Sequence, residues 1–118
     1  MLNKLNLLME KLNQDPAFKK EGFGEYLTGT MTLGFGENQY TLAFYKGTIL
    51  EVFKGIPLTG IDIAVIGPEE GWQKFYEHKN FYRAINPHHG KLSLQGNYIR
   101  AQTNINCLEY LCTKLCEL

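Results

Sequence analysis

The residues that could act as nucleophiles are few in this chain, and their settings do not favour catalysis. Ser93 is the only serine, and it stands between two leucines in a segment typical of a strand. A nucleophilic serine needs a neighbouring base and an exposed position on a sharp turn. The three cysteines, Cys107, Cys112 and Cys116, lie within the last twelve residues, and this odd, crowded set is a poor disulfide framework. Cys107 would fall in the first turn of a helix, whose dipole could lower its pKa, whereas we expect Cys112 to pack as a small apolar side chain.

The three histidines do not have the spacing of metal ligands. His88 and His89 are adjacent, so their rings point apart in an extended chain, and His78 lies beyond a proline-terminated helix. A zinc site needs about four nitrogen, sulfur or carboxylate ligands. We therefore expect no metal, no cofactor and no enzymatic activity. An enzyme that uses tyrosine, histidine and carboxylates in one pocket is the alternative left open.

Length and charge restrict the class of protein further. The chain has 118 residues, which suits one domain over 1–118, and 44% of them are apolar, as a folded core requires. Twelve basic and twelve acidic residues balance, so the chain lacks the positive field of a nucleic-acid-binding protein. No run approaches the roughly 20 apolar residues of a membrane span, and no signal peptide opens the chain. We expect a cytoplasmic protein that binds no nucleic acid and does not insert stably into membranes.

The first half of the chain changes from a helical period to a period of two. Leucines recur three and four residues apart over Met1–Asn13, which predicts a helix. From Glu25 onward, aliphatic side chains alternate with threonines, as expected of a strand with one buried and one exposed face. Short turns then lead to the segments "QYTLAFY", "TILEVF" and "IDIAVIG". The first three predicted strands form a meander, and the fourth is so apolar that we place it inside the sheet.

The second half is predicted to supply helices that cover this sheet. Gly67-Pro68-Glu69-Glu70 is a strong helix start, and an aromatic face follows. "NFYRAI" predicts a second short helix, "KLSLQG" a strand, and "YIRAQ" one further strand. Thr103 is the expected cap of a final helix whose apolar arc carries Leu108, Leu111, Cys112 and Leu115. The fold class is thus α+β, with a mainly antiparallel sheet.

Three segments together are similar to the sterol carrier protein 2 family. They are "GIDIAVIGPEEGWQKFYE", "GKLSLQGNYIRAQ" and the amphipathic terminal helix, and "YKGTILEVFKG" upstream resembles the central hairpin of that family. Asp62, the helix from Pro68, Gly90-Lys91 and Gly96 occupy the places that the family pattern assigns to them. The similarity spans about residues 25 to 115. It departs from the pattern in the "NFYRAINPHH" segment and in bulky Phe81 and Tyr82, which could plug a tunnel.

The resemblance implies an SCP2-like single domain, with a five-stranded sheet covered on one face by helices and an apolar tunnel between the layers. It also implies non-catalytic binding or transfer of a lipid, a fatty acyl group or a sterol-like molecule. The side chains that we expect to contact this ligand share an apolar or aromatic character and line the two layers: Met31, Leu33, Phe44, Trp72, Phe75, Tyr76, Phe81, Tyr82, Ile85, Leu108, Leu111, Cys112 and Leu115. The alternative is an interaction module, with its tunnel filled by its own side chains, that forms a homodimer or pairs with an enzyme.

Overall fold

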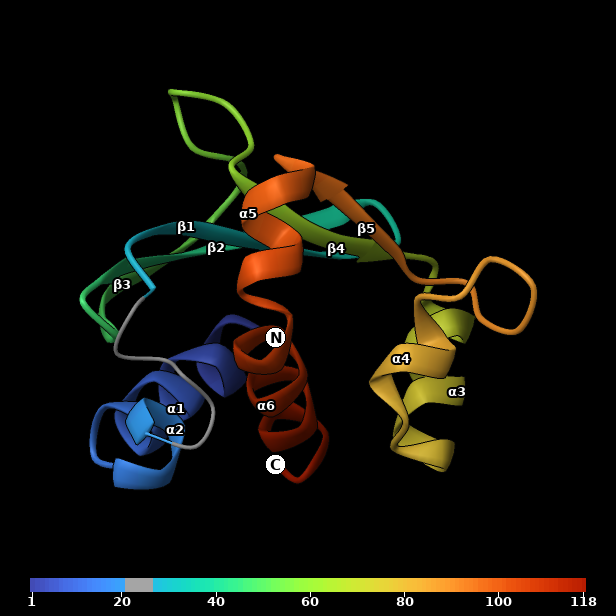
Figure 1. The fold of residues 1–118 in the computed structure, drawn as a ribbon, viewed down its shortest axis with the longest axis horizontal. Coiled ribbons are helices and arrows are strands. Elements are labelled where there is room, and N and C mark those ends of the chain that lie inside the picture. The colour runs from blue at the N-terminus through green and yellow to red at the C-terminus, as the bar shows by residue number, and fades with distance from the viewer. Residues whose placement is uncertain (21–26) are drawn as a thin grey trace.

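Five strands form one sheet in the computed structural model of the chain, which describes residues 1–20 and 27–118. The strands are β1 (Gly29–Phe35), β2 (Asn38–Tyr45), β3 (Thr48–Lys54), β4 (Ile63–Gly67) and β5 (Ser93–Gly96), in the order β3-β2-β1-β4-β5. The helices are α1 (Leu2–Asn13), α2 (Pro16–Lys20), α3 (Glu69–His78), α4 (Phe81–Ala84), α5 (Tyr98–Thr103) and α6 (Ile105–Cys116). Figure 1 shows α1, α2, α3, α4 and α6 together below the sheet.

The sheet is mixed, and the expectation of a mainly antiparallel sheet is wrong. β2 pairs antiparallel with both β1 and β3, and β5 pairs antiparallel with β4. β4, however, runs parallel to β1, with Leu33 opposite Val65. The meander of three strands and the internal position of β4 are confirmed. The direction of β4 follows from the long connection after β3, which crosses the sheet before the chain enters β4.

The outer face of the sheet is more closed than its threonines suggested. Thr32 and Thr41 are fully buried, and their hydroxyl oxygens lie 3.0 Å apart. Thr41 Oγ1 donates a hydrogen bond of 2.7 Å to the carbonyl oxygen of Gly55, in the segment after β3. The expected exposure of this threonine row therefore fails at its centre, because chain that leaves β3 folds back over it. The first two residues of the predicted strand, at positions 25 and 26, lie outside the described residues.

The helix α5 replaces the strand that was predicted over the segment "YIRAQ", just after Gly96. The backbone N–H of Arg100 donates to the Asn97 side chain, which caps α5, as asparagine at an N-cap often does. The Arg100 guanidinium then bonds both carboxylate oxygens of Asp62, at 2.7 and 3.0 Å, and this ion pair fixes α5 beside β4. Thr103 does not cap α6. Its hydroxyl donates to the carbonyl oxygen of Ile99, and Asn104 occupies the N-cap.

Candidate functional site

The layer between the sheet and the helices contains most of the side chains predicted to contact a ligand. Ten of the thirteen are buried in one apolar cluster: Met31, Leu33, Phe44, Trp72, Phe75, Phe81, Leu108, Leu111, Cys112 and Leu115. Tyr76 and Ile85 are partly buried and pack against it. Tyr82 lies apart at the rim, 48% exposed, and its hydroxyl donates to Asn106 Oδ1 at 3.1 Å. The residues predicted from the sequence thus converge on one place, with Tyr82 at its edge.

Trp72 fixes α3 against the sheet. Its indole N–H donates to the carbonyl oxygen of Gly34 at 2.7 Å, and its ring lies 4.5 Å from the ring of Phe35, centroid to centroid. Phe75 stands 6.2 Å from Trp72, and Phe81 stands 6.1 Å from Phe75, both in edge-on arrangements that aromatic rings favour. A continuous row of aromatic rings therefore extends from the sheet through α3 to α4. We call α3 and α4 with these rings the aromatic wall.

Tyr76 contributes an unsatisfied polar group to this wall. Among the residues that the structure describes, its hydroxyl is buried and has no hydrogen-bond partner. Burial raises the pKa of Tyr76 to about 12, with smaller contributions from Cys112 and Cys116. A buried donor left unpaired costs roughly 1–3 kcal/mol. Such an atom is a natural partner for a polar group that enters the apolar layer.

The second wall is α6, and it is entirely buried on its inner side. Leu108, Leu111, Cys112 and Leu115 are inaccessible to solvent. Burial raises the pKa of the Cys112 thiol, and Cys107 beside it adds to the rise. Cys107 itself has its pKa raised to about 12 by burial. The idea that the helix dipole could activate Cys107 is therefore wrong, because Cys107 lies fully within the core.

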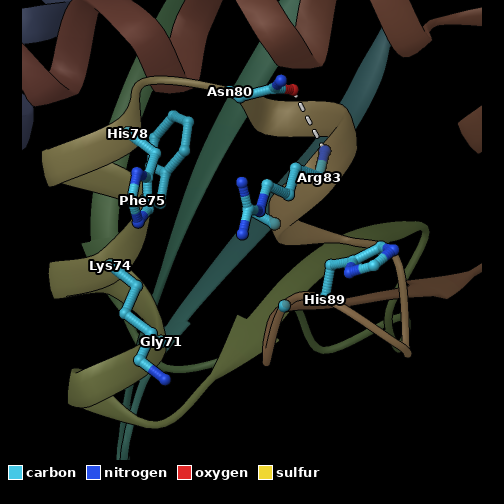
Figure 2. A pocket seen from close by; sticks show the side chains of 9 residues that line it. Gly71, Lys74, Phe75, His78, Asn80, Arg83 and His89 are labelled. Atoms are coloured by element: carbon cyan, nitrogen blue, oxygen red, sulfur yellow. Dashed lines mark hydrogen bonds between the residues drawn. The ribbon is translucent and has the colours of Figure 1, made fainter.

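A small pocket opens on the outer side of the aromatic wall, between α3, α4 and the turn that follows α4 (Figure 2). Its volume is about 140 Å³, and it is lined by Gly71, Lys74, Phe75, His78, Asn80, Arg83, Ala84, His89 and Gly90. Figure 2 shows Arg83 extending from α4 toward α3. We call this space the basic pocket. Phe75 belongs both to this pocket and to the apolar cluster.

The basic residues of this pocket are the site that sequence reasoning missed. His78 and His89 were considered only as metal ligands or catalytic groups, and Lys74 and Arg83 not at all. The available signal was weak: Lys74 and His78 are four residues apart and therefore share one face of α3. The approach of Arg83 and His89 depends on tertiary packing. His88, adjacent in sequence, does not line the pocket.

Other pockets lie at the surface and involve little of the predicted ligand layer. Three more have volumes of about 490, 500 and 520 Å³. Of the thirteen predicted residues, only Phe75 and Ile85 border any of these four spaces. None of the four runs between the sheet and α6, so the apolar tunnel stays a prediction.

Groups with other chemistry are scattered. Over residues 1–20 and 27–118, no three histidine, cysteine, aspartate or glutamate side chains gather as a metal site would require. Ser93 is exposed at the start of β5, where its oxygen accepts a hydrogen bond from Gln95. No helix in the same ranges is both long and apolar enough to span a bilayer.

Comparison with known proteins gives a fold rather than a close relative. No family model matches the sequence, and no curated protein matches it. Among solved structures, the chain is similar to a crystal structure of sterol carrier protein 2, with a TM-score of 0.75 and 16% identity over 98% of this chain and 95% of that one. It is also similar to a UbiJ-SCP2 ubiquinone synthesis protein, with a TM-score of 0.63 and 18% identity over 93% and 85%.

A third similar structure is a conserved hypothetical protein from Thermus thermophilus, described as possibly a sterol carrier protein. Its TM-score is 0.67 at 18% identity, over 92% of this chain and 80% of that one. The architecture is therefore that of an α+β protein with helices on a mixed five-stranded sheet. This chain has the SCP2-like fold, as the sequence resemblance predicted.

Proposed function

We propose that this protein binds or carries a hydrophobic small molecule, of lipid, fatty acyl or sterol-like character, between the sheet and its helices. The observation that carries the proposal is the convergence of twelve predicted ligand-contacting residues in one apolar layer, within a fold also found in sterol carrier protein 2. Ligand sites of this class are mostly apolar, with few polar groups. Here the Tyr76 hydroxyl is such a group, ready to bond the polar end of a ligand.

Entry of the ligand requires the aromatic wall to separate from α6. Among the described residues, the side-chain hydrogen bonds across this seam are few: Tyr82 bonds Asn106 and Glu109 at an exposed position, and the Cys116 thiol donates to the Tyr76 carbonyl oxygen at 3.5 Å. Each such hydrogen bond contributes only about 1 kcal/mol of net stability, because water can take the place of the lost partner. Apolar contacts rather than side-chain hydrogen bonds therefore hold most of this seam together. The ligand then takes the place of contacts among the rings and the α6 side chains.

The proposed binding involves no covalent chemistry. Burial keeps the thiols of Cys107 and Cys112 protonated, and only a thiolate is a good nucleophile. All three cysteines are free, which suits a reducing compartment such as the cytoplasm. Pairing with a second copy or with an enzyme, the alternative from the sequence, has no observation that favours it.

Lipid extraction and Trp72 fluorescence test the proposal together. Organic extraction of the purified protein, followed by mass spectrometry, should recover a hydrophobic compound. Dodecanol at micromolar concentrations should change the emission of Trp72, the only tryptophan, because it lies in the apolar layer beside Phe75. Butanol is the matched control with the same hydroxyl and a short tail. No recovered lipid and no response to dodecanol would refute the proposal.

A further inference from the structure

We propose that the basic pocket is a binding site for an anionic group of phosphate or carboxylate chemistry. Four side chains that are positively charged or can become so line it: Lys74 and His78 from α3, Arg83 from α4 and His89 from the turn after α4. No carboxylate lines it among the described residues. The chain has equal numbers of acidic and basic residues, so a pocket lined by basic side chains without a carboxylate is a local excess of positive charge. An anionic ligand would neutralise it.

The charges of this cluster are not neutralised within the described part of the chain. None of its four side chains forms an ion pair there. Glu70 lies one turn before Lys74, but Lys91 already holds its carboxylate at 2.5 Å. Lys91, followed by the weaker field of Lys74, lowers the pKa of Glu70. Lys74 and Arg83 therefore keep donors available for a ligand, and Arg in particular suits the planar, two-pronged binding of oxyanions.

Backbone segments approach one another closely around the pocket, and two glycines allow this approach. A Cβ at Gly90 would overlap the carbonyl oxygen of Ala84, and a Cβ at Gly71 would lie 3.0 Å from the Cβ of Lys91. The Leu92 N–H donates to the same Ala84 oxygen at 3.0 Å, and Asn80 caps α4 by accepting from the Arg83 backbone N–H. These contacts hold the turn that contains His89 against α4. The packing of the backbone therefore fixes where His89 and Arg83 stand relative to each other.

Size indicates what the pocket accepts. Its volume of about 140 Å³ is well below the roughly 300–1,000 Å³ of sites that enclose a whole small-molecule ligand. A single phosphate or carboxylate group with its nearest atoms suits it. Because Phe75 forms one side of the pocket and also belongs to the apolar cluster, an anionic group in the pocket would place an attached alkyl chain at the aromatic wall.

The inference does not depend on the proposed carrier function, since a free anion would also satisfy the pocket. Titration of the ¹⁵N-labelled full chain with inorganic phosphate tests it. Amide signals of Gly71, Lys74 and Gly90 should shift and saturate. The variants Lys74→Gln and Arg83→Gln should each raise the Kd about tenfold, since one charge-assisted hydrogen bond is lost. Both positions are exposed, so thermal unfolding should be unchanged.

Matched controls separate a site from general charge. Lys54→Gln removes an exposed charge from β3, at the opposite edge of the sheet from β5, and should leave the Kd unchanged. His89→Gln should weaken binding, whereas His88→Gln, outside the pocket, should not. An absence of shifts at the pocket in saturating phosphate, or equal losses in Lys54→Gln and Lys74→Gln, would overturn the inference.

Dodecyl phosphate and dodecanol distinguish the source of the anion. Tighter binding of dodecyl phosphate than of inorganic phosphate, lost in Arg83→Gln, supports an amphipathic ligand with its head in the pocket. Equal binding of the two supports a free anion. If dodecanol changes Trp72 emission while neither phosphate affects the pocket, the carrier proposal stands and the anion site is refuted. If phosphate shifts the pocket signals, while dodecanol leaves Trp72 emission unchanged and extraction recovers no lipid, the anion site stands and the carrier proposal is refuted.

Discussion

The two walls that face the sheet differ in how completely their apolar side chains are buried and their polar groups are hydrogen-bonded. The fully buried residues on the inner side of α6 are leucines and cysteines, and burial keeps the thiols of Cys107 and Cys112 neutral. The aromatic wall contains the buried Tyr76 hydroxyl, which has no hydrogen-bond partner in the described part of the chain, a half-exposed Tyr82 at its rim and the basic pocket on its outer side. The difference leads us to propose that α6 mainly supplies stability, whereas the aromatic wall is the side that a ligand would contact.

The largest expected effect is on stability, at the α6 wall. Leu111→Ala should lower the free energy of unfolding by about 2–5 kcal/mol, because the buried side chain leaves a cavity. Denaturant unfolding of the full chain measures it. Ile99→Ala on α5 is the control: Ile99 is 76% exposed, and its loss should change stability by no more than about 0.5 kcal/mol. Similar values for the two variants would mean that α6 is not the structural wall.

The thiols of α6 should differ in reactivity by orders of magnitude. At pH 8, an alkylating reagent should modify Cys116, which is partly exposed, before Cys107 and Cys112. A pKa of about 12 at Cys107 leaves roughly a thousandfold less thiolate than an ordinary cysteine with a pKa near 8.5. Mass spectrometry of time-quenched samples gives the order of modification. Equal rates at the three sites in the folded protein would show that the inner face of α6 opens readily.

The raised pKa values of Cys107 and Tyr76 make the stability of the folded protein depend on pH. The folded protein holds the protons of Cys107 and Tyr76 more tightly than the unfolded chain, since both pKa values are raised to about 12. Their contribution is fully present below the unfolded pKa values, near 8.5 and 10, and is lost as the pH rises toward 12. Denaturant midpoints should therefore fall above about pH 8.5, and a midpoint that rose there would contradict the burial of these groups.

The smallest effect is expected at the aromatic wall. Tyr76→Phe should leave the free energy of unfolding unchanged or raise it by up to about 1 kcal/mol, because it removes a buried hydroxyl that has no hydrogen-bond partner among residues 1–20 and 27–118. The variant should nevertheless bind dodecanol less tightly, since the polar partner is lost. Tyr45→Phe is the matched control, because Tyr45 is 54% exposed at the end of β2, and loss of its hydroxyl should not alter binding. A clear loss of stability in Tyr76→Phe would mean that its hydroxyl is satisfied within the fold.

Local periodicity was sufficient to predict most elements, and its failures have physical causes. Tyr98 and Ile99 have strand propensity, but Asn97 caps a helix there, and the Arg100–Asp62 pair holds that helix beside β4. The direction of β4 was not predictable from its own residues, since an apolar run is compatible with parallel or antiparallel pairing. The α2 helix after Asp15 was likewise missed. It is only five residues long, and Asp15 accepts from the Ala17 N–H at its start.

The two candidate sites were not equally accessible from the sequence. The apolar layer followed from side-chain patterns, because residues at helical spacing such as Trp72 and Phe75 share a face that must be buried. The basic pocket did not, because Lys74, Arg83 and His89 come from three segments that only tertiary packing brings together. The glycines that permit this approach, Gly71 and Gly90, gave no sequence signal for it, because the atoms that a Cβ would meet there belong to other segments, Lys91 and Ala84.

The most direct test of the central claim is a measurement of contacts between a bound alkyl chain and the two walls. Isotope-filtered nuclear Overhauser spectra of the protein with dodecanol should show cross-peaks from the methylene protons to the rings of Trp72 and Phe75 and to the methyl groups of Leu111. Cross-peaks confined to exposed residues such as Ile99, with the signals of Trp72 and Phe75 unchanged at saturation, would contradict a ligand site between the sheet and its helices.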